Sequence, residues 1–223
     1  MFTKKITAAA FVVAALASAS AAHAQSVDIR VIGTITPAAC VPTVGNGGVV
    51  DYGLIAASSL SPTSFNQLRE QTLPLTITCD APVQVAIRAI DNRADSKVAG
   101  VVSNLAGVSD DKANFGLGTA GQANIGGYVL RFAKGTFTAD GAPVFATGSA
   151  SNGDSWDAST QGVLQGGAEN LQSWSDSDGG APISFTQLNG SLSVQAVLNK
   201  GEALPLNDEI ELNGLATLEI VYL

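Results

Sequence analysis

The side chains that most often carry out enzymatic chemistry are sparse in this chain. Its only histidine, His23, lies in the first 24 residues, and Ser-His-Asp and Cys-His nucleophiles are therefore excluded from everything that follows. The remaining option is Ser-Lys or carboxylate-pair chemistry, for which the candidates are Asp110, Asp111, Asp176 and Asp178. Loop carboxylates are more often solvated turn residues. The sequence therefore predicts a protein that is not an enzyme and has no cofactor.

The two cysteines, Cys40 and Cys79, are the next reactive groups. An even number of cysteines in an exported chain favours a disulfide. A metal or redox pair is the alternative, but the wide spacing and the lack of any later histidine argue against it. Closing a loop of about 40 residues would stabilise the fold by roughly 4 kcal/mol on the chain-entropy model.

Three further motifs each have a functional and a structural interpretation. Asp176-Ser177-Asp178-Gly179 resembles part of a calcium loop but lacks the later ligands, which favours a surface turn. Trp156 and Trp174 could form a sugar-binding platform on loops, although each is more simply a plug for the core. Asn189-Gly190-Ser191 matches a glycosylation sequon, but a hairpin turn explains it better.

Residues 1–24 have the pattern of a secretory signal peptide. Lys4 and Lys5 precede an apolar run from Ile6 to about Leu16, and Ala22-His23-Ala24 is a small-x-small cleavage site. The run is shorter than the ~20 residues of a spanning helix. We therefore expect residues 25–223 to be exported. The net charge of −8 makes nucleic acid an improbable partner.

The exported part alternates in the manner of β-strands. About 200 residues fit one all-β domain, and strands are predicted from period-2 patterns. Asn189-Gly190 predicts a hairpin between two of these strands. Residues 94–124 and 147–180 are loop-like, with Phe115 and Leu117 as buried anchors in the first. The predicted strands are Ser26–Thr36, Val49–Ile55, Leu73–Cys79, Val83–Ile90, Tyr128–Phe132, Ala142–Ala146, Ile183–Leu188, Ser191–Leu198 and Asn213–Leu223.

The last predicted strand has an apolar face. Its members are Ala216, Leu218, Ile220 and Tyr222. At the other end of the exported chain, Val27, Ile29 and Val31 alternate with polar residues in the same way. Exposed apolar strands template pairing with other chains. We therefore expect a protein that joins copies of itself by exchanging strands.

These features together resemble a known family. Gly33-Thr34-Ile35-Thr36-Pro37-Ala38-Ala39-Cys40, the strand ending at Cys79 and a C-terminal strand with penultimate Tyr222 resemble the pilin subunits of chaperone-usher fimbriae. Val49-Val50-Asp51-Tyr52-Gly53, the Asp91-Asn92-Arg93 turn and Leu218 to Leu223 are most similar to the beta-type fimbrial subunits. The likeness covers both ends and about half of the exported chain.

The resemblance implies an immunoglobulin-like antiparallel β-sandwich with an incomplete sheet and long loop insertions. Residues 37–223 would form this domain, and residues 25–36 would be a donor strand overlapping its first strand. Val27, Ile29 and Val31 would be the donor residues. The acceptor groove and chaperone contact would comprise Ala216, Leu218, Ile220, Tyr222 and the Leu223 carboxylate. The implied partners are a periplasmic chaperone, an outer-membrane usher and other fimbrial subunits, in most cases copies of this chain.

Two functional hypotheses follow. The first is a structural subunit of a surface fimbria, assembled by donor-strand exchange and contributing to adhesion. The alternative is a single-domain exported adhesin or ligand-binding β-sandwich that does not polymerise and binds a host surface or a glycan receptor through the loops around Trp156 and Trp174. Deletion of Ser26 to Val31 separates the two, because only the first requires that segment for assembly.

Overall fold

The computed structural model describes residues 29–33, 38–108, 110–159 and 161–223. The predicted signal peptide and Val27 lie outside these residues. The chain divides into two compact units, residues 1–36 and 37–223, which are described separately. No helix among the described residues is long and apolar enough to cross a membrane.

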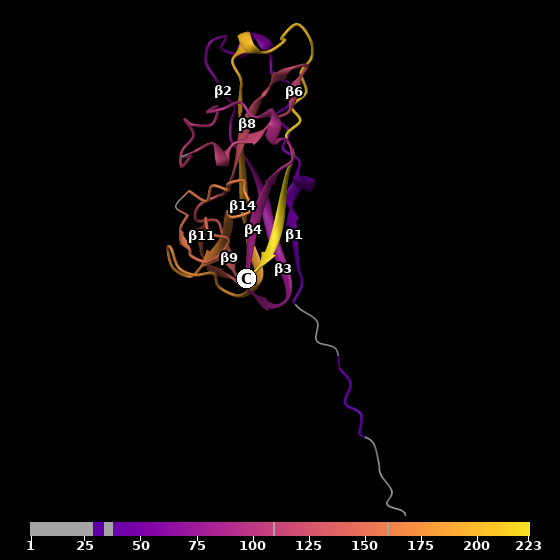
Figure 1. Cartoon of the computed structure of the whole chain (residues 1–223), viewed down its shortest axis with the longest axis vertical. Helices are drawn as coiled ribbons and strands as arrows, with labels where there is room; N and C mark the ends of the chain where they lie inside the picture. The colour runs from indigo at the N-terminus through magenta and orange to yellow at the C-terminus, as the bar shows by residue number, and fades with distance from the viewer. Residues whose placement is uncertain (1–28, 34–37, 109, 160) are drawn as a thin grey trace, which may run out of the picture. The chain divides into compact units, whose positions relative to one another are not determined.

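The larger unit is built from strands and single turns of 3₁₀ helix (Figure 1). Its first sheet has the strand order β1-β3-β14-β8-β5, with three short strands at its margins. These five are β1 (Cys40–Val44), β3 (Gln71–Val83), β14 (Phe185–Leu198), β8 (Gly126–Phe132) and β5 (Phe115–Gly116), and the marginal strands are β2 (Asn66–Gln67), β9 (Thr138–Ala139) and β10 (Ala142–Pro143).

The second sheet has the order β12-β11-β13-β4-β15. Its strands are β12 (Asp157–Ala158), β11 (Phe145–Ser149), β13 (Leu171–Ser175), β4 (Val85–Asp91) and β15 (Ala216–Tyr222), and a separate hairpin joins β6 (Thr119–Ala120) to β7 (Ala123–Asn124). All strand pairs are antiparallel. The predicted fold class, an immunoglobulin-like antiparallel β-sandwich, is confirmed. The 3₁₀ turns are η1 (Gly45–Gly48), η2 (Ala57–Ser59), η3 (Ala94–Ser96), η4 (Asp111–Ala113) and η5 (Gly201–Ala203).

The core lies between the two sheets because strand side chains alternate between faces. In β3, Leu75 and Ile77 are buried, and in β4, Val85 and Ile87 are buried opposite them. Trp174 is the largest buried side chain and packs within 6.1 Å, between ring centroids, of three phenylalanines. The predicted anchors Phe115 and Leu117 are confirmed as buried.

The long insertion after β4 packs against the outer face of the first sheet and is not a free loop. Val101, Val102 and Leu105 pack on Val129 and Val197, which lie on the outer faces of β8 and β14. Every residue of β8 is therefore buried, because the core covers one face and the insertion covers the other. This explains a strand without polar alternation in an antiparallel sheet.

The two long sides of the sandwich differ. On the side of β8, the segment 161–166 bridges the sheets: Leu164 N–H donates to Leu130 C=O at 2.9 Å, and Gly166 forms a parallel bridge with Ala89. On the other side, β1 and β15 are the facing edge strands, and no described residue pairs with the outer edge of either as a strand. One side is thus sealed by the chain itself, and the other is open.

Two of the predicted strands, Ser26–Thr36 and Val49–Ile55, are wrong where the structure describes them. Residues 29–33 belong to no strand, and the first strand is instead β1, which begins at Cys40. Residues 49–55 are irregular, and Gly53 adopts φ 65°, which a regular strand does not permit. β3 is also longer than the predicted strand Leu73–Cys79, because it runs from Gln71 to Val83.

The Asn189-Gly190 hairpin is wrong as well. β14 runs straight through both residues, and its register with β3 is continuous from Gln187 to Val194. Gly190 is needed for a different reason: a Cβ atom there would meet the Phe137 ring at 2.3 Å. The glycine makes room for a ring on the sheet face, a known use of glycine inside strands.

Candidate strand-binding groove

A cavity of about 1100 Å³ lies along the open side of the sandwich. One bank is the end of β1 with residues 47–55, and the other is residues 208–218, which lead into β15. The floor is formed by apolar side chains of the core. Floor residues are Leu73, Leu75, Ile87, Leu117, Ile125, Leu130, Leu192, Val194, Ala196 and Leu198.

The edge of β15 that faces this groove has free backbone hydrogen-bonding groups. Asn92 N–H donates to Leu215 C=O, and Leu223 N–H donates to Gln84 C=O, so the odd-numbered residues face β4. Backbone groups of successive strand residues point to alternate sides. The N–H and C=O groups of the even-numbered residues from Ala216 to Tyr222 therefore point into the open side.

The edge of β1 offers fewer backbone hydrogen-bonding groups to an added strand. Asp80 N–H donates to Ala39 C=O, which places Ala39, Val41 and Thr43 toward β3 and leaves Cys40 and Pro42 facing the groove. Pro42 has no N–H to donate, and proline is typical of protected edges. An added strand would find its donors and acceptors chiefly on β15.

Tyr222 closes one end of this open side. Its hydroxyl accepts a hydrogen bond of 2.8 Å from Cys40 N–H, which joins the end of β15 to the start of β1. Cys40 is itself held on β3 by the disulfide with Cys79, with 4.0 Å between the two Cα atoms. The predicted disulfide is confirmed. The groove is thus bridged at the Tyr222 end and extends the other way past Ala216 to Leu212.

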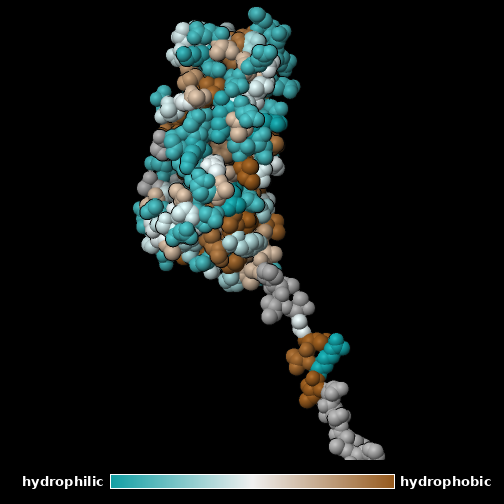
Figure 2. Space-filling model, in the orientation of Figure 1, coloured by the Kyte–Doolittle hydropathy of each residue, from teal (hydrophilic) through white to brown (hydrophobic). Residues whose placement is uncertain are grey.

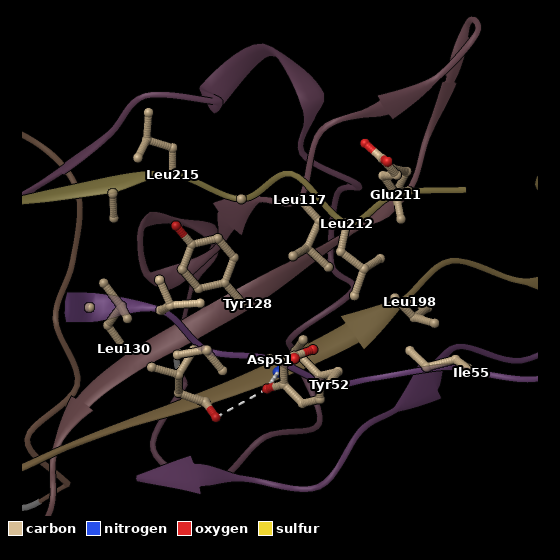
Figure 3. Close-up of a pocket in the computed structure, with 18 of the residues that line it drawn as sticks. Asp51, Tyr52, Ile55, Leu117, Tyr128, Leu130, Leu198, Glu211, Leu212 and Leu215 are labelled. Atoms are coloured by element: carbon tan, nitrogen blue, oxygen red, sulfur yellow. Dashed lines mark hydrogen bonds between the residues drawn. The ribbon is translucent and has the colours of Figure 1, made fainter. Parts of the chain in front are cut away.

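Two tyrosines shape the far part of the groove (Figure 3). The Tyr52 hydroxyl donates to Val194 C=O at 3.2 Å and accepts from Ala196 N–H at 3.0 Å, which fixes the irregular bank on β14. Burial raises the pKa of Tyr52. Burial, with a smaller contribution from the Asp91 charge, also raises the pKa of Tyr128. Both phenols therefore stay neutral at physiological pH, and both side chains line the groove.

The predicted acceptor residues occupy different positions. Ala216 and Leu218 line the groove, while Ile220 is half-buried against the core without lining it. Tyr222 and Leu223 are 49% and 45% exposed and lie outside the groove lining. Of the predicted donor residues, Ile29 and Val31 are 87% and 92% exposed within their own unit, and Val27 lies outside the described residues.

Sequence reasoning missed most of the second bank. Ile210 and Leu212 line the groove and alternate with Glu209 and Glu211, which is a period-2 signal in an irregular segment. The rim is also apolar, because Leu54 is fully exposed and Val49 and Leu215 are 59% and 49% exposed. Figure 2 shows further brown, apolar surface where Figure 1 draws β15, β1 and β3.

The structure gives three of the four candidate catalytic carboxylates local hydrogen-bonding roles in turns. Asp110 Oδ1 accepts from Lys112 N–H, and Asp111 Oδ1 accepts from Gly100 N–H and from the Asn114 amide. Asp176 Oδ1 accepts from the neighbouring Ser177 hydroxyl. Within the described ranges, no three His, Cys, Asp or Glu side chains cluster as a metal site would require.

The tryptophan platform is wrong, because Trp174 is fully buried in the core. Trp174 has the plug role that was the simpler interpretation, whereas Trp156 is half-buried on its loop. Two aromatic faces on one surface are therefore not available. The platform was inferred from two tryptophans in a loop-like region, and β13 turned out to be a core strand within that region.

Comparison with known proteins gives a family and two similar chains. A family model described as "Protein of unknown function (DUF1120)" matches residues 29–129. Protein GltF of Escherichia coli (strain K12) is 31% identical over 257 aligned residues, covering 100% of both chains. Uncharacterized protein YhcF of the same strain is 29% identical over 226 residues, covering 92% of this chain and 93% of that protein.

Proposed function

We propose that this chain, which belongs to the same family as Protein GltF and matches the DUF1120 model over residues 29–129, is a strand-accepting structural subunit of a cell-surface fimbria. In this proposal, a strand from another polypeptide enters the groove beside β15 and completes the second sheet. The observation that carries the proposal is the free backbone edge of β15 above a 1100 Å³ apolar groove. Strand addition draws affinity from such an edge and specificity from alternate side chains.

The energetics support an occupant from outside the domain. Each apolar side chain buried in the groove contributes roughly 1.5 to 3 kcal/mol. Four or five of them would add free energy comparable to the ~5 to 15 kcal/mol that stabilises a whole domain. The bare domain would therefore be marginal or prone to aggregation, since an uncovered apolar edge recruits other strands.

The proposed occupants are a periplasmic chaperone before assembly and the N-terminal segment of another subunit afterwards. Ile29, Val31 and Ile32 offer an apolar segment that is exposed within its own unit, and Val27 continues the alternation in the sequence. An outer-membrane usher would exchange one occupant for the other. The subunit would thus pass through the periplasm, where the Cys40–Cys79 disulfide forms, and end at the cell surface.

The test uses the chain without its first 24 residues and a synthetic peptide of residues 25–36. We expect the chain to bind the peptide, and the complex to melt at a higher temperature than the free chain. A version lacking Ser26 to Val31 should still bind the peptide but should no longer form polymers. A control peptide with Val27, Ile29 and Val31 replaced by Ser should not bind.

Two outcomes would contradict the proposal. One is a free chain that remains a stable monomer with no gain in melting temperature at saturating peptide. The other is polymer formation that persists after deletion of Ser26 to Val31. Either result would mean that the groove is an ordinary cavity of an exported domain and does not bind a strand.

A further inference from the structure

A second cavity, of about 360 Å³, lies at the junction of β4, β11, β13 and residues 157–159 and 161–165. β13 and β4 share a single register pair, Gln172 and Ile87, and on the Ala89 side of this pair β4 bridges Gly166 instead of β13. The chain segment 161–166 crosses the resulting gap, because Gly166 pairs with Ala89 and Val163 pairs with Arg131 of the other sheet. The cavity is therefore built by strands and a bridging segment, not by a loose surface loop.

The floor of this cavity is apolar and its walls are rich in amides. Ile87, Ala89 and Leu164 are each at most 2% exposed and form the base. Around them stand side chains that donate and accept hydrogen bonds without carrying charge. These uncharged lining residues are Ser149, Ser159, Gln161, Gln165, Asn170 and Gln172.

Gln172 is the central polar group. Among the described residues its Oε1 atom has no hydrogen-bond partner, although the atom is shielded from solvent. Such atoms are uncommon in native proteins, because leaving one unpaired costs about 1 to 3 kcal/mol. Gly148 faces Gln172 across the β11–β13 ladder, and a Cβ atom there would lie 2.7 Å from Nε2. The absence of a side chain at Gly148 therefore leaves room for the Gln172 amide.

Charge restricts what the cavity can bind. Among the residues that the structure describes, no Lys, Arg or His lines it, and Asp157 is the one acidic lining residue. A phosphate, a sulfate or an acidic sugar would meet no compensating cation and would face a carboxylate. Hydroxyl groups, by contrast, match side-chain amides in both directions, since each amide offers donors and an acceptor.

We propose that the cavity beside Gln172 binds a single uncharged sugar unit, with ring C–H groups on Ile87, Ala89 and Leu164 and hydroxyls on the surrounding amides. The volume is near the lower end of the roughly 300 to 1000 Å³ of small-molecule sites, which suits one sugar ring better than a chain. The site gives the proposed fimbrial subunit a contact to glycans that does not use the groove.

The groove and the sugar site touch at one residue. Ile87 lines both cavities, so a strand in the groove packs on one side of a wall of the sugar site. The polar lining residues are not shared. Binding of a sugar and binding of a strand can therefore be measured separately on the same protein.

The test is saturation-transfer NMR on the disulfide-bonded chain carrying the 25–36 peptide. The probes are the methyl glycosides of glucose, galactose, mannose and N-acetylglucosamine, with N-acetylneuraminic acid as the acidic comparator. We expect transfer to at least one neutral glycoside and none to the acid. Gln172→Ala should weaken that binding by roughly tenfold, the effect of losing one hydrogen bond.

Gly148→Ala provides a second variant, because its methyl group would displace the Gln172 amide without removing it. Gln122→Ala, in an exposed turn outside the cavity, is the matched control and should bind as the parent does. All variants should keep their peptide binding, which reports folding and the groove. The inference is overturned if no neutral glycoside shows transfer or if the protein prefers the acid. It is also overturned if Gln172→Ala and Gly148→Ala bind the sugar as tightly as the parent does. A chain that binds sugar but no peptide would instead reject the proposed assembly role alone.

Discussion

The Tyr222 hydroxyl accepts a hydrogen bond from the backbone N–H of Cys40 at 2.8 Å, across the open side of the sandwich. This contact joins two edge strands that share no ladder, one at the start of the domain and one at its end. It places the closed end of the groove at the disulfide. An added strand must therefore occupy the part of the edge from Ala216 to Ile220 and continue toward Leu212.

Tyr222→Phe removes the hydrogen bond and keeps the ring. We expect a loss of about 0.5 to 1.5 kcal/mol in the free energy of unfolding, because one hydrogen bond is lost at a partly exposed site. Urea denaturation would measure it. Tyr128→Phe is the control, since the structure describes no hydrogen bond for that hydroxyl. Equal losses in the two variants would show that the Tyr222 contact does not hold the two edges together.

Leu218→Asp tests the groove. Leu218 points into the groove and is half-buried, so a carboxylate there would be desolvated by an added strand. We expect roughly 100-fold weaker binding of the 25–36 peptide, measured by fluorescence anisotropy. Thr72→Asp, on the exposed face of β3 and outside the groove lining, should bind the peptide as the parent does. Leu218→Ala should be intermediate, which guards against a variant that simply fails to fold.

The sequence predicted β15, β3, β4 and β8 because each alternates or runs apolar over five or more residues, and those patterns follow from packing on a core. It did not predict the banks of the groove. Residues 49–55 contain alternating apolar residues, yet Gly53 with its positive φ and the Tyr52 hydroxyl on β14 hold them irregular. Tertiary contacts decided that segment, and no local pattern reports them.

The true tight hairpin of this region is Asp140-Gly141, between β9 and β10. Asp140 and Gly141 have φ of 47° and 86°, which a two-residue type I′ hairpin turn requires at both central positions. Asn189-Gly190 has the same kind of turn sequence but lies in mid-strand. The sequence alone could not rank the two, because the deciding contact is the Phe137 ring above Gly190.

Gly190→Val tests this explanation. Its side chain would collide with the Phe137 ring, and overpacking of this kind typically costs about 1 to 3 kcal/mol. Thermal unfolding would measure it. Gly190→Val should cost less stability when it is added to Phe137→Leu than when it is added to the parent, because the leucine leaves more room above residue 190. Additive losses would mean that the ring does not select the glycine.

Replacing both cysteines by serine should destabilise the domain by about 4 kcal/mol, from the entropy of a loop of about 40 residues. The bond joins direct partners on β1 and β3, so its loss also frees the strand that holds Tyr222. Guanidinium denaturation of the oxidised chain, the reduced chain and the double-serine variant would measure the effect. If reduction leaves the denaturation midpoint unchanged, the β1–β3 ladder holds without the bond.

Asp140 links stability to pH. Its carboxylate accepts hydrogen bonds from the Thr186 hydroxyl at 2.6 Å and from the Gln187 and Thr186 N–H groups at 2.8 and 3.1 Å, where the β14–β3 register shifts. These bonds, led by that of the Thr186 hydroxyl, lower the pKa of Asp140 below its ordinary value of 3.8. Because the folded state favours the charged form, its contribution to stability is present above that value and is lost as the pH falls through the folded pKa.

Asp140→Asn keeps a residue that tolerates positive φ but removes the charge. We expect the parent to exceed this variant in unfolding free energy near neutral pH, and the difference to shrink below about pH 4. Urea denaturation at several pH values would measure it. Thr186→Val should bring the carboxyl pKa of Asp140, followed by NMR, back toward its ordinary value. Thr136→Val, whose hydroxyl bonds to Ala133 and Ser191 instead, should leave it lowered. A difference between parent and Asp140→Asn that stays constant from pH 7 to pH 2 would show that the Thr186 and Gln187 bonds do not depend on the charge.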